Sequence, residues 1–432
     1  MPSLNVAILG AGIGGLAAAW DLVRSGRSVT VFEAAATPGG LASGFKRPGW
    51  DWSVEKFYHH WFQTDRHMLG LIAELGLSDR VIFPRPYTVL LHNGRWYPFD
   101  SIRHALLFPG LGFGLNKLRF GLVGLYLRTT GNWRTLERHT VDAWMRRWAG
   151  GYVYETMWAP LVTGKFGPYA REINMAWLWA RLKARTTRLG TYRGGFQQFA
   201  DDLVEILKQR GVRFEFDTPI ERIDPAAAGG LSLTIQGGAV RTFDQCLVTT
   251  SPGLLARLAP ALPQDYLAGL LSLKHMGAVV LVLSLKQRLS EQGYYWFNIP
   301  KPAGFPFLAL VEHTNFVPRE HFNGEHIVYC GDYLPAGHEY FSLNKEQLLE
   351  RFLPALIKFN PEFEPDWINE TWLFSTPYAQ PVPLVNHSRN IPAIATPIAG
   401  LFFASMSQVY PWDRGTNFAV EIGRKAAGLM GA

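Results

Sequence analysis

The chain has 432 residues, which is enough for two or three domains, and it carries 42 Lys and Arg against 35 Asp and Glu. Hydrophobic residues make up 48% of the sequence, which excludes a disordered protein, and the net charge of +7 is spread without a basic block, which excludes nucleic acid as the main partner. The two cysteines, Cys246 and Cys330, exclude a disulfide framework or a Cys-based zinc site and favour a reducing, cytoplasmic setting.

The N-terminus predicts a nucleotide-binding unit. An apolar strand over residues 6–9 is followed by a glycine-rich turn, a helix over 16–24 and a second buried strand over 29–32. Strand, glycines, helix, strand and a final acid follow one another within thirty residues. This order makes a glycine turn without a ligand the weaker interpretation.

Each residue of the turn has a physical task. Gly10 permits a tight bend, Gly12 lets the backbone approach a pyrophosphate, and Gly15 permits close packing of helix on strand. Glu33 ends the second strand, where its carboxylate is placed to accept hydrogen bonds from ribose hydroxyls. An acid at this position disfavours the 2′-phosphate of NADP, so that NAD and FAD remain.

A second glycine pair, Gly39-Gly40, follows within the segment 37–42. In a two-domain flavoprotein such a pair would let the backbone approach the flavin side of the cofactor, whereas an NAD dehydrogenase has no need of it there. The pair therefore favours FAD.

Five segments occur in order along the chain: GAGIGGL with VFEA and PGGLASGF (10–45), YRGGFQQFADDLVEILKQRGVRFEFDTPIERI (192–223), QCLVTTSPG (245–253), WLFSTPYAQPVPLVN (372–386) and GLFFASMSQVYPWDRGTNFAVEIGRKAAGLM (400–430). With them the chain resembles the flavin amine oxidase superfamily, especially its protoporphyrinogen oxidase-like and carotenoid desaturase-like branches. The resemblance implies an α/β fold. A Rossmann-type FAD-binding domain with a parallel sheet is interleaved with an α+β substrate domain that has a mixed sheet.

The resemblance also implies which residues hold FAD, without a covalent bond, because the last segment has no Cys or His. The predicted cofactor residues are Gly10, Gly12, Ile13, Gly14, Gly15, Glu33, Ala34, Gly39, Gly40, Leu41, Ile220, Ser405, Met406, Arg414, Gly415, Thr416 and Asn417. Two positions depart from the family pattern. Ser405-Met406 replace a Gly-Asp pair, and Leu41 stands where many relatives carry Arg.

The three pieces of the predicted FAD-binding domain are separated by two insertions. Those pieces are residues 1–60, 190–255 and 385–432. The first insertion, 61–189, is expected to be mostly helical and to cover the substrate. The second, 256–384, is expected to contain a sheet, with strands over 277–285 and 326–332.

Candidate catalytic residues lie in the segment EKFYHHWF soon after the second glycine pair. His59 and His60 have side chains whose pKa suits a proton acceptor, Tyr58 would line the cavity, and Lys56 could hold a water or balance charge on reduced flavin. The alternative is an aromatic plug with a His pair that hydrogen-bonds backbone. No metal site is predicted, since no third ligand is spaced to join the two histidines.

Two further aromatic candidates come from the C-terminal half. Tyr378 aligns with a segment that often presents an aromatic side chain to the active site, and Trp412 precedes the final helix. The start of that helix, at 414–417, would stabilise negative charge on the flavin through its backbone N–H groups. Capping by Asp413, Thr416 or Asn417 and simple core packing of the aromatics are the alternatives.

Residues 104–128 are apolar and glycine-rich with scattered basic residues. A buried helical hairpin is the favoured interpretation, because the glycines and Pro109 weaken an amphipathic surface helix. The alternative is a patch that attaches to the inner face of a membrane. No spanning segment is predicted, since the longest stretch free of charge, 391–412, contains three prolines.

The leading functional hypothesis is an FAD-dependent oxidoreductase that takes hydride from a C–N or C–C bond of an apolar or aromatic small molecule. A second is a redox-neutral flavin-dependent mutase acting on a nucleotide-sugar, with a phosphate held by arginines of the first insertion: Arg146, Arg147, Arg171, Arg181 and Arg185. A third is a flavin-binding protein without catalysis, which the missing acid at Met406 keeps open.

Overall fold

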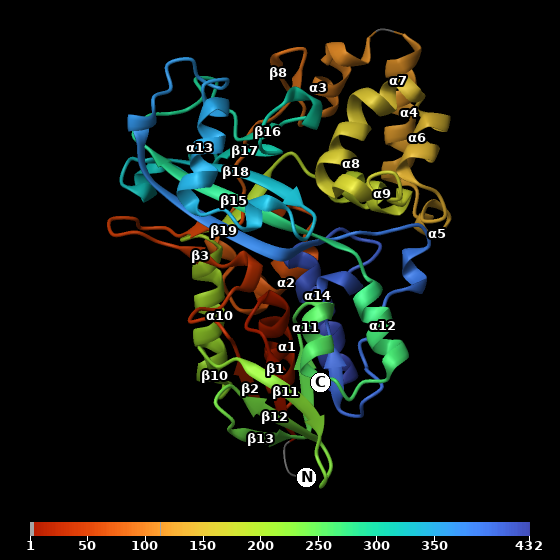
Figure 1. Ribbon diagram of the computed structural model, residues 1–432, viewed down its shortest axis with the longest axis vertical. Coiled ribbons are helices and arrows are strands. Elements are labelled where there is room, and N and C mark those ends of the chain that lie inside the picture. Colours follow the sequence, from red (N-terminus) through yellow and green to blue (C-terminus); the bar gives the residue numbers. More distant parts are fainter. Residues whose placement is uncertain (1–3, 113) are drawn as a thin grey trace.

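The computed structural model describes residues 4–112 and 114–432, so Phe113 of the stretch 104–128 lies outside the described residues. Figure 1 shows a lower part built around a parallel sheet, and an upper part in which a mixed sheet lies beside a group of helices. The red N-terminal and the blue C-terminal segments both belong to the lower part. The two parts are therefore interleaved along the chain, as predicted.

The lower sheet has five parallel strands in the order β10-β2-β1-β14-β20. They are β1 (Asn5–Leu9), β2 (Ser28–Phe32), β10 (Arg213–Glu215), β14 (Gln245–Val248) and β20 (Leu401–Phe403). In the register, Ala7 of β1 lies opposite Thr30 on one side and Cys246 on the other. This arrangement confirms the predicted parallel sheet.

Both faces of this sheet are buried, which explains its continuous apolar strands. Val6 and Ile8 pack under four helices, while Ala7 and Leu9 pack against a small antiparallel sheet. The four helices are α1 (Ile13–Arg24), α2 (Arg66–Glu74), α10 (Phe196–Gln209) and α14 (Thr416–Leu429). The opposite face carries β11 (Ile220–Pro225), β12 (Leu231–Ile235), β13 (Val240–Phe243), α11 (Pro252–Leu258) and α12 (Gln264–Ser272).

Helices α1 and α14 cross in direct backbone contact. A Cβ on Gly423 would lie 2.2 Å from the Gly14 carbonyl oxygen, and a Cβ on Gly14 would lie 3.2 Å from the Ala419 oxygen. The final helix is therefore seated against the helix that follows the glycine-rich turn.

The upper sheet has seven strands in the order β19-β15-β18-β17-β16-β7-β8. They are β7 (Thr88–His92), β8 (Arg95–Pro98), β15 (His275–Leu285), β16 (Trp296–Asn298), β17 (Ala309–Glu312), β18 (His326–Leu334) and β19 (Ile368–Pro381), with α13 (Lys345–Leu356) packed on one face. The strands predicted over 277–285 and 326–332 are confirmed as β15 and β18. Hairpin β7–β8 lies inside the insertion expected to be mostly helical, and it joins this sheet through a parallel pair with β16.

The helical group beside this sheet comes from the first insertion. Its members are α3 (Ile102–Leu107), α4 (Leu115–Thr129), α5 (Trp133–Leu136), α6 (Val141–Trp148), α7 (Gly151–Val153), α8 (Ala159–Phe166) and α9 (Met175–Ala184). Their shared core includes the buried ring pair of Phe166 and Trp177, whose centroids are 4.7 Å apart. Among residues 4–112 and 114–432, no helix is long and apolar enough to cross a membrane.

The prediction of a buried helical hairpin over 104–128 is wrong. Only Val123 and Leu127 of α4 are buried, because the helix packs on its neighbours along one narrow side. Leu118, Leu122 and Leu125 are each more than half exposed. The glycines of this stretch do not prevent an apolar helix at the surface.

Short strands connect the two parts. They are β3 (Gly44–Phe45), β4 (Val54–Glu55), β5 (Trp61–Phe62), β6 (Val81–Ile82) and β9 (Leu189–Tyr192). Glu55 at the end of β4 is buried, and its carboxylate accepts a hydrogen bond from Phe196 N–H, the first residue of α10, at 3.1 Å. Burial raises the pKa of Glu55 from 4.5 to about 7, against the opposing effect of that hydrogen bond.

Because the folded state holds this proton up to a higher pH than the unfolded state, Glu55 makes the protein less stable as the pH rises from 4.5 to 7. We expect Glu55→Gln, which keeps the acceptor for Phe196, to be more stable than wild type at pH 8 by up to about 3 kcal/mol. At pH 4 the difference should be small. Urea unfolding at the two pH values measures it, with the exposed Glu205→Gln as control. A gain of equal size at both pH values would contradict the assignment.

Candidate cofactor and substrate site

The glycine-rich turn after β1 has no room for a side chain at two of its positions. Gly10 has φ +107°, and a Cβ there would lie 2.6 Å from Thr249 Oγ1. A Cβ on Gly15 would lie 2.1 Å from the Gly10 carbonyl oxygen. Glycine at both positions is therefore what allows α1 to begin so close to β1.

In front of α1 the structure forms an open cradle of backbone. The first turn, starting at Ile13, has no side-chain cap and no acidic residue, so its N–H groups face outward. A Cβ on Gly12 would have no neighbour nearer than the Gly40 Cα, at 3.9 Å, and Gly39 N–H donates to the Ala11 oxygen at 2.9 Å. The two glycine segments thus meet around a space suited to a pyrophosphate at a helix N-terminus.

Glu33 holds this cradle in shape. Its carboxylate accepts hydrogen bonds from Ala11 N–H at 2.7 Å and from Ala35 N–H at 2.9 Å, and the neighbouring Ala34 is exposed. An ionised carboxylate can accept about four hydrogen bonds, so two positions remain for ribose hydroxyls.

The segment that enters β11 lies beside Glu33. Thr218 N–H donates to the Glu33 carbonyl oxygen at 2.9 Å, and Asp217 N–H donates to the Ala35 oxygen at 3.2 Å. Ile220 follows, half-buried, where the β11–β12 register is irregular. This places Ile220 near the end of the cradle that would hold the adenosine.

The start of α14 is fixed by its side chains in a way that the sequence does not reveal. Thr416 Oγ1 accepts from Trp61 Nε1 at 2.9 Å, and Asn417 Oδ1 accepts from His67 N–H and Met68 N–H, the first turn of α2. The predicted capping of α14 by Thr416 or Asn417 is therefore wrong. The helix begins after Gly415 without a side-chain cap, which leaves its first backbone N–H groups available to a flavin.

Ser405 and Met406 occupy the position of the family's Gly-Asp pair. The Ser405 hydroxyl accepts from Ser407 N–H at 3.2 Å and forms the cap of a short 3-10 turn, Met406–Gln408. Tyr378 Oη lies 2.9 Å from Ser405 Oγ and 2.7 Å from Ser407 Oγ. Tyr378 therefore supports this turn, and it is not among the residues lining the cavities described next.

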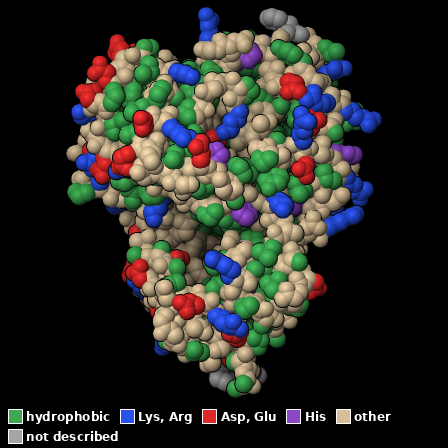
Figure 2. Space-filling model, viewed as in Figure 1, with side chains coloured by type: hydrophobic (Ala, Val, Ile, Leu, Met, Phe, Trp, Pro, Cys, Tyr) green, Lys and Arg blue, Asp and Glu red, His purple; other side chains and the backbone are tan. Residues whose placement is uncertain are grey.

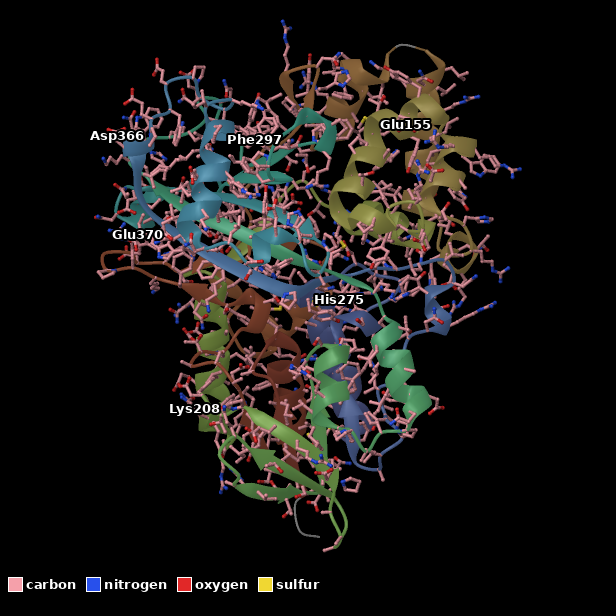
Figure 3. The ribbon with its side chains drawn as sticks, viewed as in Figure 1. Glu155, Lys208, His275, Phe297, Asp366 and Glu370 are labelled. Atoms are coloured by element: carbon pink, nitrogen blue, oxygen red, sulfur yellow. The ribbon has the colours of Figure 1, made fainter. Side chains whose placement is uncertain are left out.

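A small cavity lies at the junction of the two parts. Figure 2 shows the surface hollowed at this junction, and Figure 3 labels His275, where β15 passes it. Its lining residues are Leu41, Phe57, Tyr58, His59, Ala278, Val280, Tyr333, Thr376, Ala379 and Arg414. Leu41 directly follows the glycine pair, so the cavity continues from the cradle toward the upper sheet.

Of the segment 55–62, the cavity is lined by Phe57, Tyr58 and His59. His59 Nδ1 lies 2.5 Å from the Phe57 carbonyl oxygen, and burial lowers the pKa of His59 to about 4, so the ring is neutral at pH 7. His60 instead packs among aromatic rings, and burial lowers its pKa to about 3. Lys56 is half-buried and is not a lining residue, and Trp61 is fully buried in the core.

A second small cavity shares the lining residue Arg414 with the first. Its lining residues are Trp177, Gln380, Pro381, Pro383, His387, Met406, Ser407, Val409, Tyr410, Trp412, Asp413 and Arg414. Trp412 is stacked between Trp179, at 5.2 Å, and Phe418, at 5.5 Å. Trp412 and Met406 are thus placed together at this cavity, from a segment the sequence had singled out.

Asp413 lies at the centre of a cluster of cations between the cavities. Its Oδ2 lies 2.9 Å from Lys165 Nζ and 2.9 Å from an Arg181 nitrogen, and Oδ1 accepts from Gln380 Nε2 at 3.2 Å. Burial alone would raise the pKa of Asp413, but the charges of these cations and of Arg414 outweigh it and hold the pKa well below its usual range. Asp413 does not cap α14, contrary to one prediction.

The five arginines proposed to hold a phosphate do not converge. Arg146 is paired at the surface with Asp142 and Glu155, and Arg147 and Arg171 are exposed. Of the five, Arg181 belongs to the Asp413 cluster and lies close enough to Arg185 for the two charges to repel. The arrangement gives the mutase hypothesis no phosphate site of the kind proposed.

Several residues of the site escaped prediction. Lys165 and Tyr333 belong to no motif, and Gln380 lies in the family segment 372–386 without having been singled out; the three reach the site from α8, β18 and β19. Alternate side chains of β15 and β18 point to opposite faces of the sheet, but the sequence does not indicate which face lines the cavity.

Comparison with known sequences identifies a family. The family of flavin-containing amine oxidoreductases matches residues 13–430. The chloroplastic protoporphyrinogen oxidase of Nicotiana tabacum is 23% identical over 59% of this chain and 52% of its own length. The hydroxyneurosporene desaturase of Rhodobacter capsulatus is 24% identical over 58% of this chain and 57% of its own. The matches thus span about half the length of these relatives.

Solved structures share the fold over the whole chain. Reduced UDP-galactopyranose mutase superposes with a TM-score of 0.77 at 15% identity, covering 99% of this chain and 95% of that one. Cyclohexylamine oxidase from Brevibacterium oxydans superposes with a TM-score of 0.74 at 18% identity, covering 99% of both chains. At such identities the likeness shows the fold alone, and it confirms the predicted α/β architecture.

Proposed function

This chain belongs to the flavin-containing amine oxidoreductase family, whose members are FAD-dependent oxidoreductases, and on that premise we propose that it takes hydride from a C–N or C–C bond of an apolar or aromatic small molecule. The observation that carries the proposal is the cavity between the two parts of the protein, which begins at Leu41. Its walls are mostly apolar or aromatic, as in sites for ligands of this kind.

The backbone around Gly12 and Gly40 fits the pyrophosphate of FAD, and the uncapped start of α14 fits the flavin. Bound there, FAD supplies the hydride acceptor, while the protein orients the substrate and excludes water. We assign that task to Tyr58 and Tyr333 on the cavity wall, together with Ala278 and Val280 of β15. The proximity of these side chains to Leu41 supports a substrate held beside the flavin.

His59 is the favoured proton acceptor. It lines the cavity and is neutral at pH 7, and if its Nδ1–H donates to the Phe57 oxygen, the Nε2 lone pair remains free to take a proton. His60 is placed less well, because it packs among rings and lines neither cavity. Flavoenzymes of this kind need no protein nucleophile.

The proposal is tested on purified protein with bound FAD. Anaerobic mixing with apolar amines, and separately with hydroaromatic compounds, should bleach the flavin absorbance as hydride is transferred. Protein that binds no FAD would overturn the proposal. Turnover that requires pre-reduced flavin and leaves the substrate's oxidation state unchanged would point to the mutase instead.

We also propose that the surface of α3 and α4 attaches to anionic lipid. Its exposed apolar side chains are Ile102, Leu106, Leu107, Leu115, Leu118, Leu122, Leu125 and Tyr126. Four basic residues accompany them, Arg103, Lys117, Arg119 and Arg128, and residues 101–136 contain no Asp or Glu. Apolar side chains flanked by positive charge suit the interface of an anionic bilayer.

Sedimentation with vesicles tests this attachment. We expect Leu118→Glu/Leu122→Glu to lose at least tenfold in binding to vesicles containing phosphatidylserine, because the two acids place charge in the apolar face and remove positive excess. Neutral phosphatidylcholine vesicles should bind the wild type more weakly. Exposed Leu271, on α12, offers a matched control as Leu271→Glu. Equal sedimentation of wild type and double variant would contradict the proposal.

A further inference from the structure

The Asp413 cluster holds more positive than negative charge. Lys165, Arg181 and Arg414 surround one carboxylate, and the side chain of Lys165 is only 7% exposed. Buried charges are normally paired, since an uncompensated charge in the interior is costly. Burial lowers the pKa of Lys165 well below its usual value. Even without the charge of Lys165, the two arginines outnumber the one carboxylate, so one positive charge is left without a partner from the cluster itself.

Nearby carboxylates are engaged elsewhere. Asp332 is paired with Lys301, and Glu137 accepts from the Ser388 hydroxyl at 2.8 Å and from Tyr410 Oη at 3.1 Å. The excess is thus not balanced by another acid that the described residues bring to Asp413.

Arg414 places part of this positive charge at the two cavities. Its guanidinium donates Nε–H to Gln380 Oε1 at 2.8 Å and Nη2–H to Tyr333 Oη. Arginine has five N–H donors, so the hydrogen bonds of the described residues leave donors on Nη1 and Nη2. Arg414 lines both cavities, and it is the residue at which they adjoin.

We propose that the second cavity binds a carboxylate group of the substrate, with Arg414 as the direct partner and with Lys165 and Arg181 as positioning residues. The proposal rests on the proposed function, since it adds a negatively charged end to an apolar or aromatic substrate. The planar guanidinium matches a carboxylate in two parallel hydrogen bonds. The rings of Tyr58 and Tyr333 in the adjoining first cavity suit the apolar body of an aromatic acid.

The geometry also gives the substrate a direction. With the carboxylate at Arg414 in the second cavity, the rest of the molecule extends into the first cavity, past Tyr333 toward Tyr58, His59 and Leu41. The bond to be oxidised would then lie at the apolar end of the substrate, away from its charge.

A pair of probes of equal shape tests the site. 4-Phenylbutanoate and its neutral amide, 4-phenylbutanamide, are titrated into the FAD-loaded protein, and binding is followed by the flavin spectrum and by tryptophan fluorescence. We expect the acid to bind at least tenfold more tightly than the amide. Inorganic phosphate, as a third probe, should compete at least tenfold more weakly than the acid, because it lacks the apolar body.

Two Lys→Met variants form a matched pair. Lys165→Met keeps an unbranched chain on the rings of Trp177 and Tyr333 but removes the charge, and it should lower the preference for the acid at least fivefold. Lys183→Met removes a lysine of α9 that bonds the Thr130 oxygen outside the cluster, and it should leave the preference unchanged. The comparison of acid with amide in wild type needs no variant, so it decides the proposal even where Lys165→Met fails to fold.

Each outcome has a distinct meaning. Equal affinity for acid and amide in a protein that binds FAD and transfers hydride overturns the carboxylate site and leaves the proposed function intact. A preference for the acid that appears in FAD-free protein but vanishes on loading means that the cations serve the cofactor, and this also overturns the site. Tight binding of phosphate alone would assign the site to a phosphorylated ligand instead.

Discussion

Gly12→Ala should fold normally and bind FAD roughly ten- to hundredfold more weakly than wild type, which corresponds to about 1–3 kcal/mol for a methyl group forced into an occupied space. Gly12 has φ −72° and ψ 169°, a conformation that any residue can adopt. Its Cβ would meet protein only at the Gly40 Cα, 3.9 Å away, so the added methyl group points into the cradle. Titration of FAD into the FAD-free variant, followed by flavin fluorescence, measures the loss.

Two other glycines separate this effect from a change in stability. Gly15→Ala should not yield folded protein, since its Cβ would lie 2.1 Å from the Gly10 oxygen. Gly70→Ala, in α2 with nothing within 4 Å of its Cβ, should leave FAD affinity unchanged. Wild-type FAD affinity in Gly12→Ala would mean that the pyrophosphate lies elsewhere.

Asp413→Asn should lower the free energy of unfolding by about 3–5 kcal/mol, because it removes the one carboxylate among three partly or fully buried cations. Chemical unfolding of the FAD-free protein measures this loss. Adding Lys165→Met to Asp413→Asn should recover part of it, since one unpaired charge then disappears with the carboxylate.

The control for Asp413 is an acid paired at the surface. Asp142 lies 3.0 Å from Arg146 with both side chains substantially exposed, and Asp142→Asn should change the free energy of unfolding by less than about 1 kcal/mol. Equal effects of the two substitutions would show that the Asp413 cluster is no more dependent on its carboxylate than a surface pair.

The N-terminal half of the candidate cofactor site could be proposed from the sequence because its determinants are local. One strand–helix–strand unit contains Gly10, Gly12, Gly15 and Glu33. Each of these residues allows or makes a close contact with backbone. The order of the remaining segments was inferred from the family resemblance. Both the parallel sheet and strands β15 and β18 follow from runs of buried apolar residues that are visible in the sequence.

The substrate side could not be predicted, because it is assembled from segments far apart along the chain. Lys165, Tyr333 and Gln380 meet Asp413 and Arg414 only once α8, β18, β19 and the last loop are packed together. Adjacency in sequence also misled: His59 and His60 are neighbours, yet only His59 lines the cavity. Consecutive side chains point in different directions, so one His of a pair can be buried in the core while the other lines the cavity.

For the prediction of α4, the low helix propensity of its glycines was given too much weight. Its glycines suggested a helix that needs burial, but the buried Val123 and Leu127 and the partly buried Phe120 hold one side on the core. The leucines on the other side of the helix remain exposed. The number of apolar residues in a sequence does not distinguish such a surface helix from a buried one.

The close crossing of α1 and α14 has a consequence for how the protein is made. The helix that begins at the nucleotide cradle is synthesised long before α14, which follows every other described element and whose Asn417 also holds the first turn of α2. Until α14 emerges, the part of α1 that packs on α14 is uncovered and the proposed flavin end of the site is absent. Cofactor loading is therefore expected to follow synthesis, and a nascent chain stalled before α14 should depend on chaperones to remain soluble.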